Sequence, residues 1–242
     1  MNFGKIFLTT LMISITLGSY ARCQEKSGKQ KAWGKSHHGS HYDEGPRTRP
    51  WILEGIGTTH FPITSSHPEV QKWFDQGNTL LHGFWFFEAE RAFRWCFKLD
   101  PECAMAYCGL ARCTHGDAKR ERRFFREALK RRDKVSTREQ AYLDVWEAKY
   151  KVNKAKGDEK KREKAVKEYV KRFDNLLIDY PDDMEARSLY WLEVLQVTQE
   201  PGDEQEPAMR YALDRVLQEV LAKDPDHVGA LHYRVHNWDG EE

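Results

Sequence analysis

The chain has 242 residues, of which 32% are charged and 40% are hydrophobic, and its formal net charge is +1. This balanced charge argues against a dedicated nucleic-acid-binding protein, which usually carries a strongly basic face. The length exceeds that of most single domains, but an array of repeats can absorb it. The sequence has no phosphate-binding loop, nucleophile elbow or glycine-rich dinucleotide turn, so it predicts no catalytic residue and assigns no enzymatic activity.

Residues 1–21 have the features of a secretory signal peptide. A lysine gives a basic start, residues 6–17 form an apolar run, and small residues precede a cleavage site near Ala21. Because the run is too short for a membrane span, we expect export, no integral membrane span after cleavage, and a periplasmic or secreted mature protein. The alternatives are retention of the segment as an anchor and a lipid anchor on Cys23, which Arg22 disfavours because a small residue is expected there.

Residues 22–54 are polar and lack periodicity, which predicts a flexible leader. The leader contains His37, His38 and His41, followed by Asp43. Clustered imidazoles can bind a transition metal, so the segment is either a soluble tether or a weak metal-binding sequence. The tether is the simpler interpretation.

A compact lead-in at residues 56–66 connects the leader to the first helix. We expect His60 and Phe61 to fold back against the first helices. Ser66, which is followed by His-Pro-Glu, is predicted to be the N-cap of the first helix.

Apolar residues recur every three or four positions between residues 70 and 113, which is the helical period. The spacing predicts a helical hairpin that is interrupted at residues 83–87. Pro101 ends the second helix, because proline disfavours helical backbone in the residue before it, and a third helix starts near Cys103. The apolar positions of the hairpin are Trp73, Phe74, Leu80, Leu81, Ala89, Ala92, Phe93, Cys96 and Phe97.

This spacing resembles the tetratricopeptide repeat, a helix–turn–helix unit of 34 residues. The residues on the repeat pattern are Trp73, Gly77, Ala89, Phe93 and Pro101, with Tyr107 and Ala111 each 34 positions after a first-helix residue. Gln76 and Leu80 depart from the usual leucine and tyrosine. The resemblance implies an all-α, right-handed superhelical solenoid of helix–turn–helix hairpins, with a concave face that binds proteins or peptides. The alternative is an amphipathic hairpin of no particular family.

A proline-centred template occurs three times, as expected for repeated units. In each copy a large apolar residue lies eight positions before the proline and an alanine lies five positions after it. An acidic residue follows each proline and favours the start of the next helix. The three copies are Phe93, Pro101 and Ala106; Phe173, Pro181 and Ala186; and Leu217, Pro225 and Ala230.

A basic block between residues 119 and 138 contains ten Lys or Arg and three acidic residues. It can bind an acidic partner or nucleic acid, or it can form the solvated face of a helix, since Phe124 and Phe125 keep helical spacing within it. The balanced overall charge favours the solvated face. Ser136 and Glu139 have the spacing of a capping box and predict a helix that runs to about residue 154.

Further amphipathic segments cover residues 165–180, 184–197, 208–222 and 228–238, so we assign residues 55–242 to one helical repeat domain. The last segment has no following helix to cover it. Because solenoids end in polar caps, we expect the chain to be an N-terminal fragment of a longer protein.

The last helical segment carries the most defined candidate for chemistry. His232 and His236 are four positions apart, so they share one helix face and can hold one divalent transition metal. His227 lies just before them, and His60 of the lead-in is a further candidate. The HExxH pattern of zinc proteases is absent. The alternative is that the histidines belong, with Tyr233, to a packing face.

Two segments, IGTTHFPITSSHPEVQKWFDQGNTLLHGF and PDHVGALHYRVHNWDG, look like a group of exported bacterial tetratricopeptide proteins of unassigned function. That group shares a His-Phe-Pro lead-in, a Phe-Asp-Gln-Gly first helix and a late helix with spaced histidines, and its chains usually continue further. The matching positions are His60, Phe74, Asp75, Gln76, Gly77, His227, Gly229, Ala230, His232 and His236. The resemblance implies a histidine-lined concave site, although Phe86 and Phe87 stand where the group often has an Asn-His pair.

The five cysteines form no CxxC motif, so neither a redox motif nor a zinc knuckle is predicted. We expect Cys96 to be a buried thiol that Cys108 can approach across the hairpin. Cys103 is expected to be the most exposed cysteine of the repeats, because it lies at a turn between helices.

Two functions are consistent with the sequence. The first is an exported scaffold that binds a protein or peptide partner on its concave face. The residues expected to contact this partner are Asn78, His82, Arg112 and Arg187. The second is a metal-binding or metal-dependent protein that holds a divalent transition metal. The predicted ligands are His60, His227, His232 and His236.

Overall fold

The computed structural model describes residues 45–46, 48–114, 117–198 and 207–239, without the side chains of residues 194–198. All of these residues belong to one compact unit, Gly34–Glu242. The predicted signal peptide and residues 22–44 of the predicted leader, with its three histidines, lie outside the described residues.

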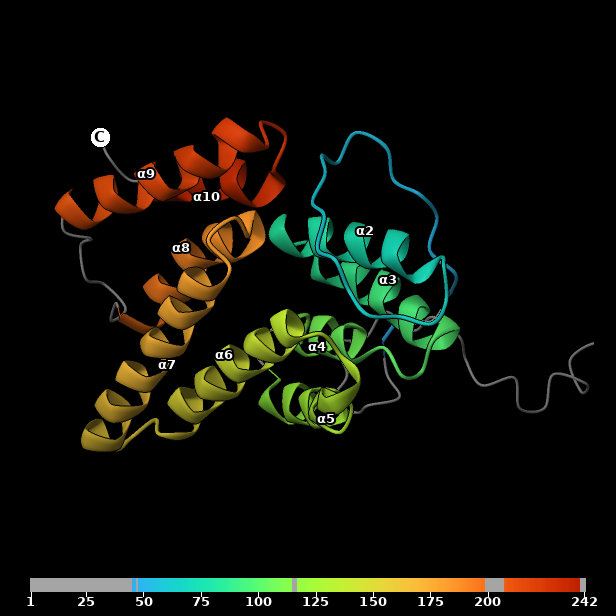
Figure 1. Cartoon of the computed structure of the whole chain (residues 1–242), viewed down its shortest axis with the longest axis horizontal. Helices are drawn as coiled ribbons and strands as arrows, with labels where there is room; N and C mark the ends of the chain where they lie inside the picture. The colour runs from blue at the N-terminus through green and yellow to red at the C-terminus, as the bar shows by residue number, and fades with distance from the viewer. Residues whose placement is uncertain (1–44, 47, 115–116, 199–206, 240–242) are drawn as a thin grey trace, which may run out of the picture. The chain divides into compact units, whose positions relative to one another are not determined.

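The described part of the chain is helical and contains no strand, which confirms the all-α prediction (Figure 1). An isolated parallel bridge joins Thr58 to His227. In chain order the helices are α2 (Val70–His82), α3 (Phe86–Leu99), α4 (Ala104–Arg112), α5 (Ala118–Leu129), the 3-10 helix η1 (Arg132–Lys134), α6 (Thr137–Lys154), α7 (Glu159–Asp179), α8 (Met184–Thr198), α9 (Pro207–Lys223) and α10 (Val228–Trp238). None of them combines the length and hydrophobicity needed to cross a bilayer.

Consecutive helices pack in pairs: α2 with α3, α4 with α5, α6 with α7, and α8 with α9 (Figure 1). The last helix, α10, packs against α9 and α8 and also contacts α2. In a simple linear array each unit touches only its neighbours. The contact between α10 and α2 departs from that arrangement, so the superhelical solenoid stays a prediction.

Local sequence signals account for several helix ends. The Ser136 and Glu139 side chains form the predicted capping box at the start of α6. Ser66, in contrast, does not cap α2, which begins at Val70. The backbone N–H and the hydroxyl of Ser66 both donate to Asp100 Oδ2, at 2.8 and 3.1 Å, because this carboxylate at the end of α3 is a stronger acceptor.

The ring of Phe93 fills the closest approach between α2, α3 and α4. Phe93 is 1% exposed, and its ring centroid lies 5.2 Å from that of Phe74. A methyl group added at Gly77 would lie 2.9 Å from the Phe93 ring, and one added at Gly109 would lie 2.6 Å from it. Both glycines are therefore required for close helix packing around this ring.

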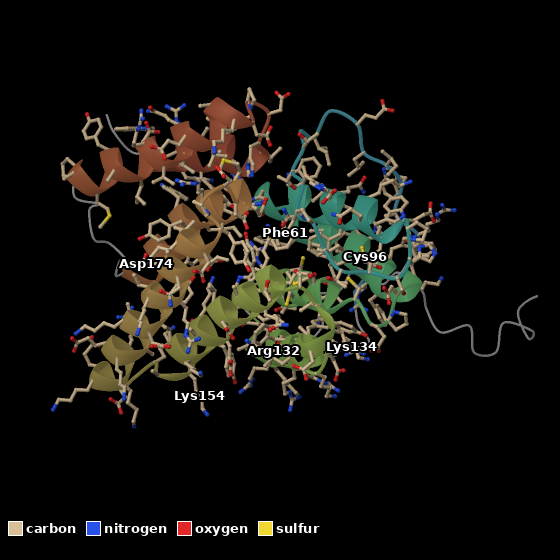
Figure 2. The ribbon with its side chains drawn as sticks, viewed as in Figure 1. Phe61, Cys96, Arg132, Lys134, Lys154 and Asp174 are labelled. Carbon is tan, nitrogen blue, oxygen red and sulfur yellow. The ribbon has the colours of Figure 1, made fainter. Side chains whose placement is uncertain are left out.

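The lead-in folds back on the helices as predicted. Figure 2 shows Phe61 between α2 and α6, where its ring centroid lies 5.5 Å from Phe74 and 4.7 Å from Tyr142. The end of the predicted leader is also held on α2, since the N–H of Leu53 donates to Gln76 Oε1 at 3.0 Å.

The basic block forms α5 and the turn after it, with Phe124 and Phe125 buried, as expected for a helix with one solvated face. The exception is Arg120, which is 1% exposed and pairs with Glu90 at 2.5 Å.

Four free cysteines are buried in the described structure: Cys96, Cys103, Cys108 and Cys113. The expectation of an exposed Cys103 is wrong. Pro101 and Glu102 of the turn are exposed, but Cys103 is packed in the core and is 1% exposed. Burial raises the pKa of the Cys103 thiol to about 12, so this group remains a protonated, unreactive thiol at neutral pH.

Candidate functional site

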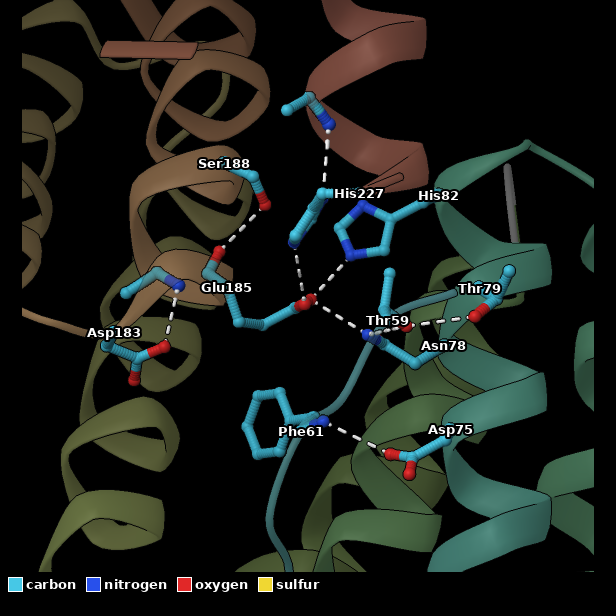
Figure 3. Close-up of polar contacts among 12 residues, drawn as sticks. Thr59, Phe61, Asp75, Asn78, Thr79, His82, Asp183, Glu185, Ser188 and His227 are labelled. Carbon is cyan, nitrogen blue, oxygen red and sulfur yellow. Dashed lines mark hydrogen bonds and ion pairs between the residues drawn. The ribbon is translucent and has the colours of Figure 1, made fainter. Parts of the chain in front are cut away.

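A buried polar network joins α2, α8 and α10 around Glu185 (Figure 3). Asp183 Oδ1 accepts the N–H of Ala186 and so positions the first turn of α8, which carries Glu185. Glu185 Oε1 accepts hydrogen bonds from His82 Nε2 at 2.5 Å and from Asn78 Nδ2 at 2.9 Å. This carboxylate is 3% exposed, so the hydrogen bonds replace its lost hydration.

His82 makes a hydrogen bond at each ring nitrogen. Its Nε2–H donates to Glu185, and its Nδ1 accepts the hydroxyl proton of Tyr233, which lies 2.7 Å away on α10. A methyl group added at Gly229 would lie 2.5 Å from His82 Nδ1, so only glycine lets α10 approach α2 this closely. A neutral imidazole satisfies both contacts at once.

His227 holds the other side of the network and starts α10. It is the N-cap residue, and its Nδ1 accepts the backbone N–H of Ala230 at 3.2 Å. Its Nε2 lies 3.5 Å from Glu185 Oε2. The carboxylate of α8 is therefore flanked by histidines from α2 and from the start of α10.

The contacts of the network shift the pKa values of Glu185, His82 and His227 in different directions. Burial raises the pKa of Glu185, but the electrostatic interaction with His82 and the hydrogen bonds from His227 and His82 outweigh it and hold the pKa well below its ordinary value. Burial lowers the pKa of His82 more than the nearby Glu185 raises it. Burial also lowers the pKa of His227, but the hydrogen bond and charge of Glu185 outweigh it and leave this pKa raised.

These pKa shifts make the free energy of unfolding depend on pH, and the direction of each shift gives the sign of that dependence. A lowered pKa contributes stability that is present above the ordinary pKa and is lost as the pH falls. His82 thus loses its contribution below its ordinary value of 6.5, and Glu185 loses its own below 4.5. The raised pKa of His227 acts in the opposite direction, with its contribution complete below 6.5 and lost above it.

We therefore expect the stability difference between the wild type and His82→Gln to narrow as the pH falls from about 7.5 to about 5. Urea denaturation followed by circular dichroism measures this difference at each pH. The matched control is Ser188→Ala, a buried hydroxyl that donates to the Glu185 carbonyl and does not titrate. Its effect on stability is expected to stay constant. If the stability differences of both variants changed with pH in the same way, the lowered pKa of His82 would be contradicted.

The network corrects two of the predicted partner contacts. Asn78 and His82 face inward as expected, but each is 1% exposed, because α8 and the start of α10 cover them. Arg187 is also engaged, with its Nε donating to the Pro181 carbonyl and its Nη1 pairing with Glu219 at 3.2 Å. These three side chains hold helices together instead of presenting a free binding surface.

Arg112, the fourth predicted contact, lines a pocket of about 270 Å³. The walls come from α2, α3, α4, α5, α6, α8 and the turn between α2 and α3. They include the apolar side chains Leu81, Phe84, Phe86, Ala111, Phe125, Trp146 and Leu192. The polar residues around the pocket are Arg112, Thr114, Glu121, Lys149, Tyr150, Asn153 and Glu193.

Two of the four charged side chains around this pocket, Lys149 and Glu193, form an ion pair with each other. Glu193 Oε2 lies 2.5 Å from Lys149 Nζ and accepts the Tyr169 hydroxyl at 2.7 Å. Burial raises the pKa of Glu193, but the charges of Lys149 and Arg112 outweigh it, so its pKa is lowered. The Arg112 guanidinium lies 5.2 Å from the Trp146 ring centroid. Within the described part of the chain it has no ion-pair partner.

The four histidines predicted as metal ligands lie in three different settings. His60 Nδ1 lies 2.9 Å from Asp75 Oδ2 in the lead-in contact. His227 belongs to the Glu185 network, while the Nε2 atoms of His232 and His236 lie 3.0 Å apart. Across the described residues, no three His, Cys, Asp or Glu side chains are arranged to hold a metal ion. The four-histidine site is therefore not assembled in this structure.

Sequence reasoning missed Glu185 and Lys149 as functional positions. Glu185 lies 103 residues from His82 in the sequence, so no local spacing connects them. Its one local signal is its place in the first turn of α8, where an acidic residue is ordinary. Lys149 looks like any solvated lysine of α6.

Comparison with known proteins gives no match to a family model, a curated protein or a solved structure. The tetratricopeptide resemblance therefore stays a prediction, and any functional assignment depends on the geometry of the chain itself.

Proposed function

We propose that this chain is an exported helical-repeat scaffold that binds a peptide segment carrying an apolar side chain next to a carboxylate. The pocket around Arg112 supports this proposal, since α2, α4, α6 and α8 all contribute to its walls. These are the first helices of four successive pairs. In helical-repeat proteins such helices line the inner face, which takes peptides or helices from a partner.

The size of the pocket is compatible with one large side chain of a peptide. It measures about 270 Å³, close to the lower end of the range of about 300–1,000 Å³ for small-molecule sites. It can accept one large side chain, while the rest of a peptide remains outside. The aromatic walls provided by Phe84, Phe125 and Trp146 suit an apolar anchor.

The observation that carries the proposal is the half-buried guanidinium of Arg112, which has no ion-pair partner among the described residues, beside these apolar walls. A planar guanidinium can bind a carboxylate through two parallel hydrogen bonds. Stacking on Trp146 limits its rotation, so less conformational entropy is lost when a ligand binds. Membership of the tetratricopeptide family, superhelical geometry and export by a signal peptide belong to the same proposal, supported by the sequence pattern.

We expect an array of short synthetic peptides to show preferential binding where Asp or Glu adjoins Leu or Phe. Replacing the acid by Asn or Gln should abolish the preference. Because a hydrogen bond to a charged group contributes about 1.5–3 kcal/mol, Arg112→Gln should weaken the best peptides by roughly tenfold or more. Fluorescence anisotropy measures these affinities.

The matched control is Arg215→Gln, which changes an exposed arginine on α9 that already pairs with Glu219. It is expected to leave peptide affinity unchanged. Equal affinity of the Arg112→Gln variant and the wild type would reject this pocket as the binding site, and indifference to the peptide carboxylate would reject the ligand class.

A further inference from the structure

His232 and His236 on α10 face each other, and neither of them lines the proposed peptide-binding pocket. The Nε2 atoms of His232 and His236 lie 3.0 Å apart on α10. The His236 side chain is 41% exposed, so a dissolved cation can reach the pair directly.

Each ring has an acceptor at its other nitrogen. His232 Nδ1 lies 2.6 Å from the backbone carbonyl oxygen of His82, which can only accept, so this nitrogen carries a proton. His236 Nδ1 lies 3.1 Å from Asp239 Oδ2, and a carboxylate at this distance favours a proton on Nδ1 as well. A neutral imidazole has one N–H. When both rings are neutral, both Nε2 atoms present lone pairs to each other, and a shared proton or metal ion removes the repulsion between them.

We propose that His232 and His236 form a two-nitrogen site for a divalent transition metal. Metal–imidazole bonds are about 2.0–2.1 Å long, so nitrogens 3.0 Å apart subtend about 95° at the ion. This angle is closest to that between adjacent positions of a square-planar or octahedral ion. The geometry therefore favours Cu²⁺ or Ni²⁺, which adopt these arrangements.

The surroundings fix both rings in place. The Phe84 ring centroid lies 4.6 Å from that of His232 and 5.7 Å from that of His236. Phe84 has φ of +59°, a left-handed conformation that is unfavourable for a residue with a bulky side chain. The Asp239 carboxylate and the His82 carbonyl stand where metal-binding histidines usually have outer hydrogen-bond partners.

The test titrates copper(II) sulfate, and separately nickel(II) chloride, into the mature chain by calorimetry. The protein carries His37→Ala, His38→Ala and His41→Ala, because the leader histidines can bind metal independently. We expect one Cu²⁺ per chain and an electron paramagnetic resonance spectrum of a tetragonal ion with two imidazole nitrogens. His236→Ala should weaken Cu²⁺ binding at least tenfold, and Asp239→Asn by roughly tenfold to a hundredfold.

His60→Ala, which removes an exposed histidine of the lead-in, is the matched control and should leave the affinity for Cu²⁺ unchanged. Circular dichroism verifies that each variant keeps its helices. A second readout is the melting temperature, which Cu²⁺ should raise in the parent protein but not in His236→Ala, since a ligand of the folded state stabilises it. No Cu²⁺ binding in the leader-substituted parent, or equal affinity in His236→Ala, would overturn the site.

Discussion

Replacing Glu185 by alanine is expected to reduce the free energy of unfolding by about 3–5 kcal/mol, the range for removing one partner of a buried charged pair. The variant leaves His82 Nε2 and Asn78 Nδ2 without their acceptor in a region that solvent does not reach. Each buried, unsatisfied donor costs about 1–3 kcal/mol. Guanidinium denaturation followed by helical circular dichroism measures the loss as a lower midpoint with an unchanged slope.

Glu185→Gln separates charge from shape. Its amide oxygen can still accept from α2, so we expect it to lose clearly less stability than the alanine variant. Glu219→Ala is the surface control, because among the described residues this partly exposed carboxylate of α9 pairs with Arg187 and Arg215 at the surface. The Glu219→Ala variant should lose less than about 1 kcal/mol of the free energy of unfolding. If Glu185→Ala were as mild as Glu219→Ala, the network would not be a stabilising centre.

The second large effect is expected at Phe93. Truncation of this buried ring to alanine should reduce stability by about 3–5 kcal/mol, because the cavity between α2, α3 and α4 cannot fully collapse. The opposite change, Gly109→Ala, places a methyl group 2.6 Å from the same ring. Overpacking of this kind costs about 1–3 kcal/mol, even though alanine is the better helix former.

A double-mutant cycle checks that the two positions share one contact. In a Phe93→Leu background the ring is gone, so Gly109→Ala is expected to become nearly neutral or stabilising. Thermal and chemical denaturation of the four proteins measure the coupling. A Gly109→Ala cost that is identical in both backgrounds would show that the crowding arises elsewhere.

The sequence predicted the first helices well because their signals are local. The spacing of Trp73, Phe93 and Pro101 identified a hairpin that the structure places at Val70–His82 and Phe86–Leu99. The capping box at Ser136 similarly identified the start of α6. Helical period, proline and capping chemistry act over a few residues, so a single sequence is sufficient to detect them.

The candidate site was less predictable because it is assembled from distant segments. The sequence placed Asn78 and His82 on a partner-binding face, and it gave no indication that Glu185 would cover them, 107 and 103 residues later in the sequence. For the same reason the predicted ligand role of His227 could not anticipate its pairing with that carboxylate. Arg112 lines the same pocket as Glu121 and Glu193, but Glu193 is paired with Lys149, and no such pairing could be read from the sequence.

The contact between α2 and α10 has a consequence for how the molecule responds to stress. In a linear array of repeats, terminal units can fray while the middle stays folded. Here the His82–Tyr233 hydrogen bond joins residues 151 positions apart. When α10 detaches, polar groups on α2 lose their partners, so α2 at the other end of the helical series is destabilised as well. The helix pairs are consequently expected to melt as one cooperative unit. The contact between α2 and α10 is expected to form late in folding, since it closes a long loop.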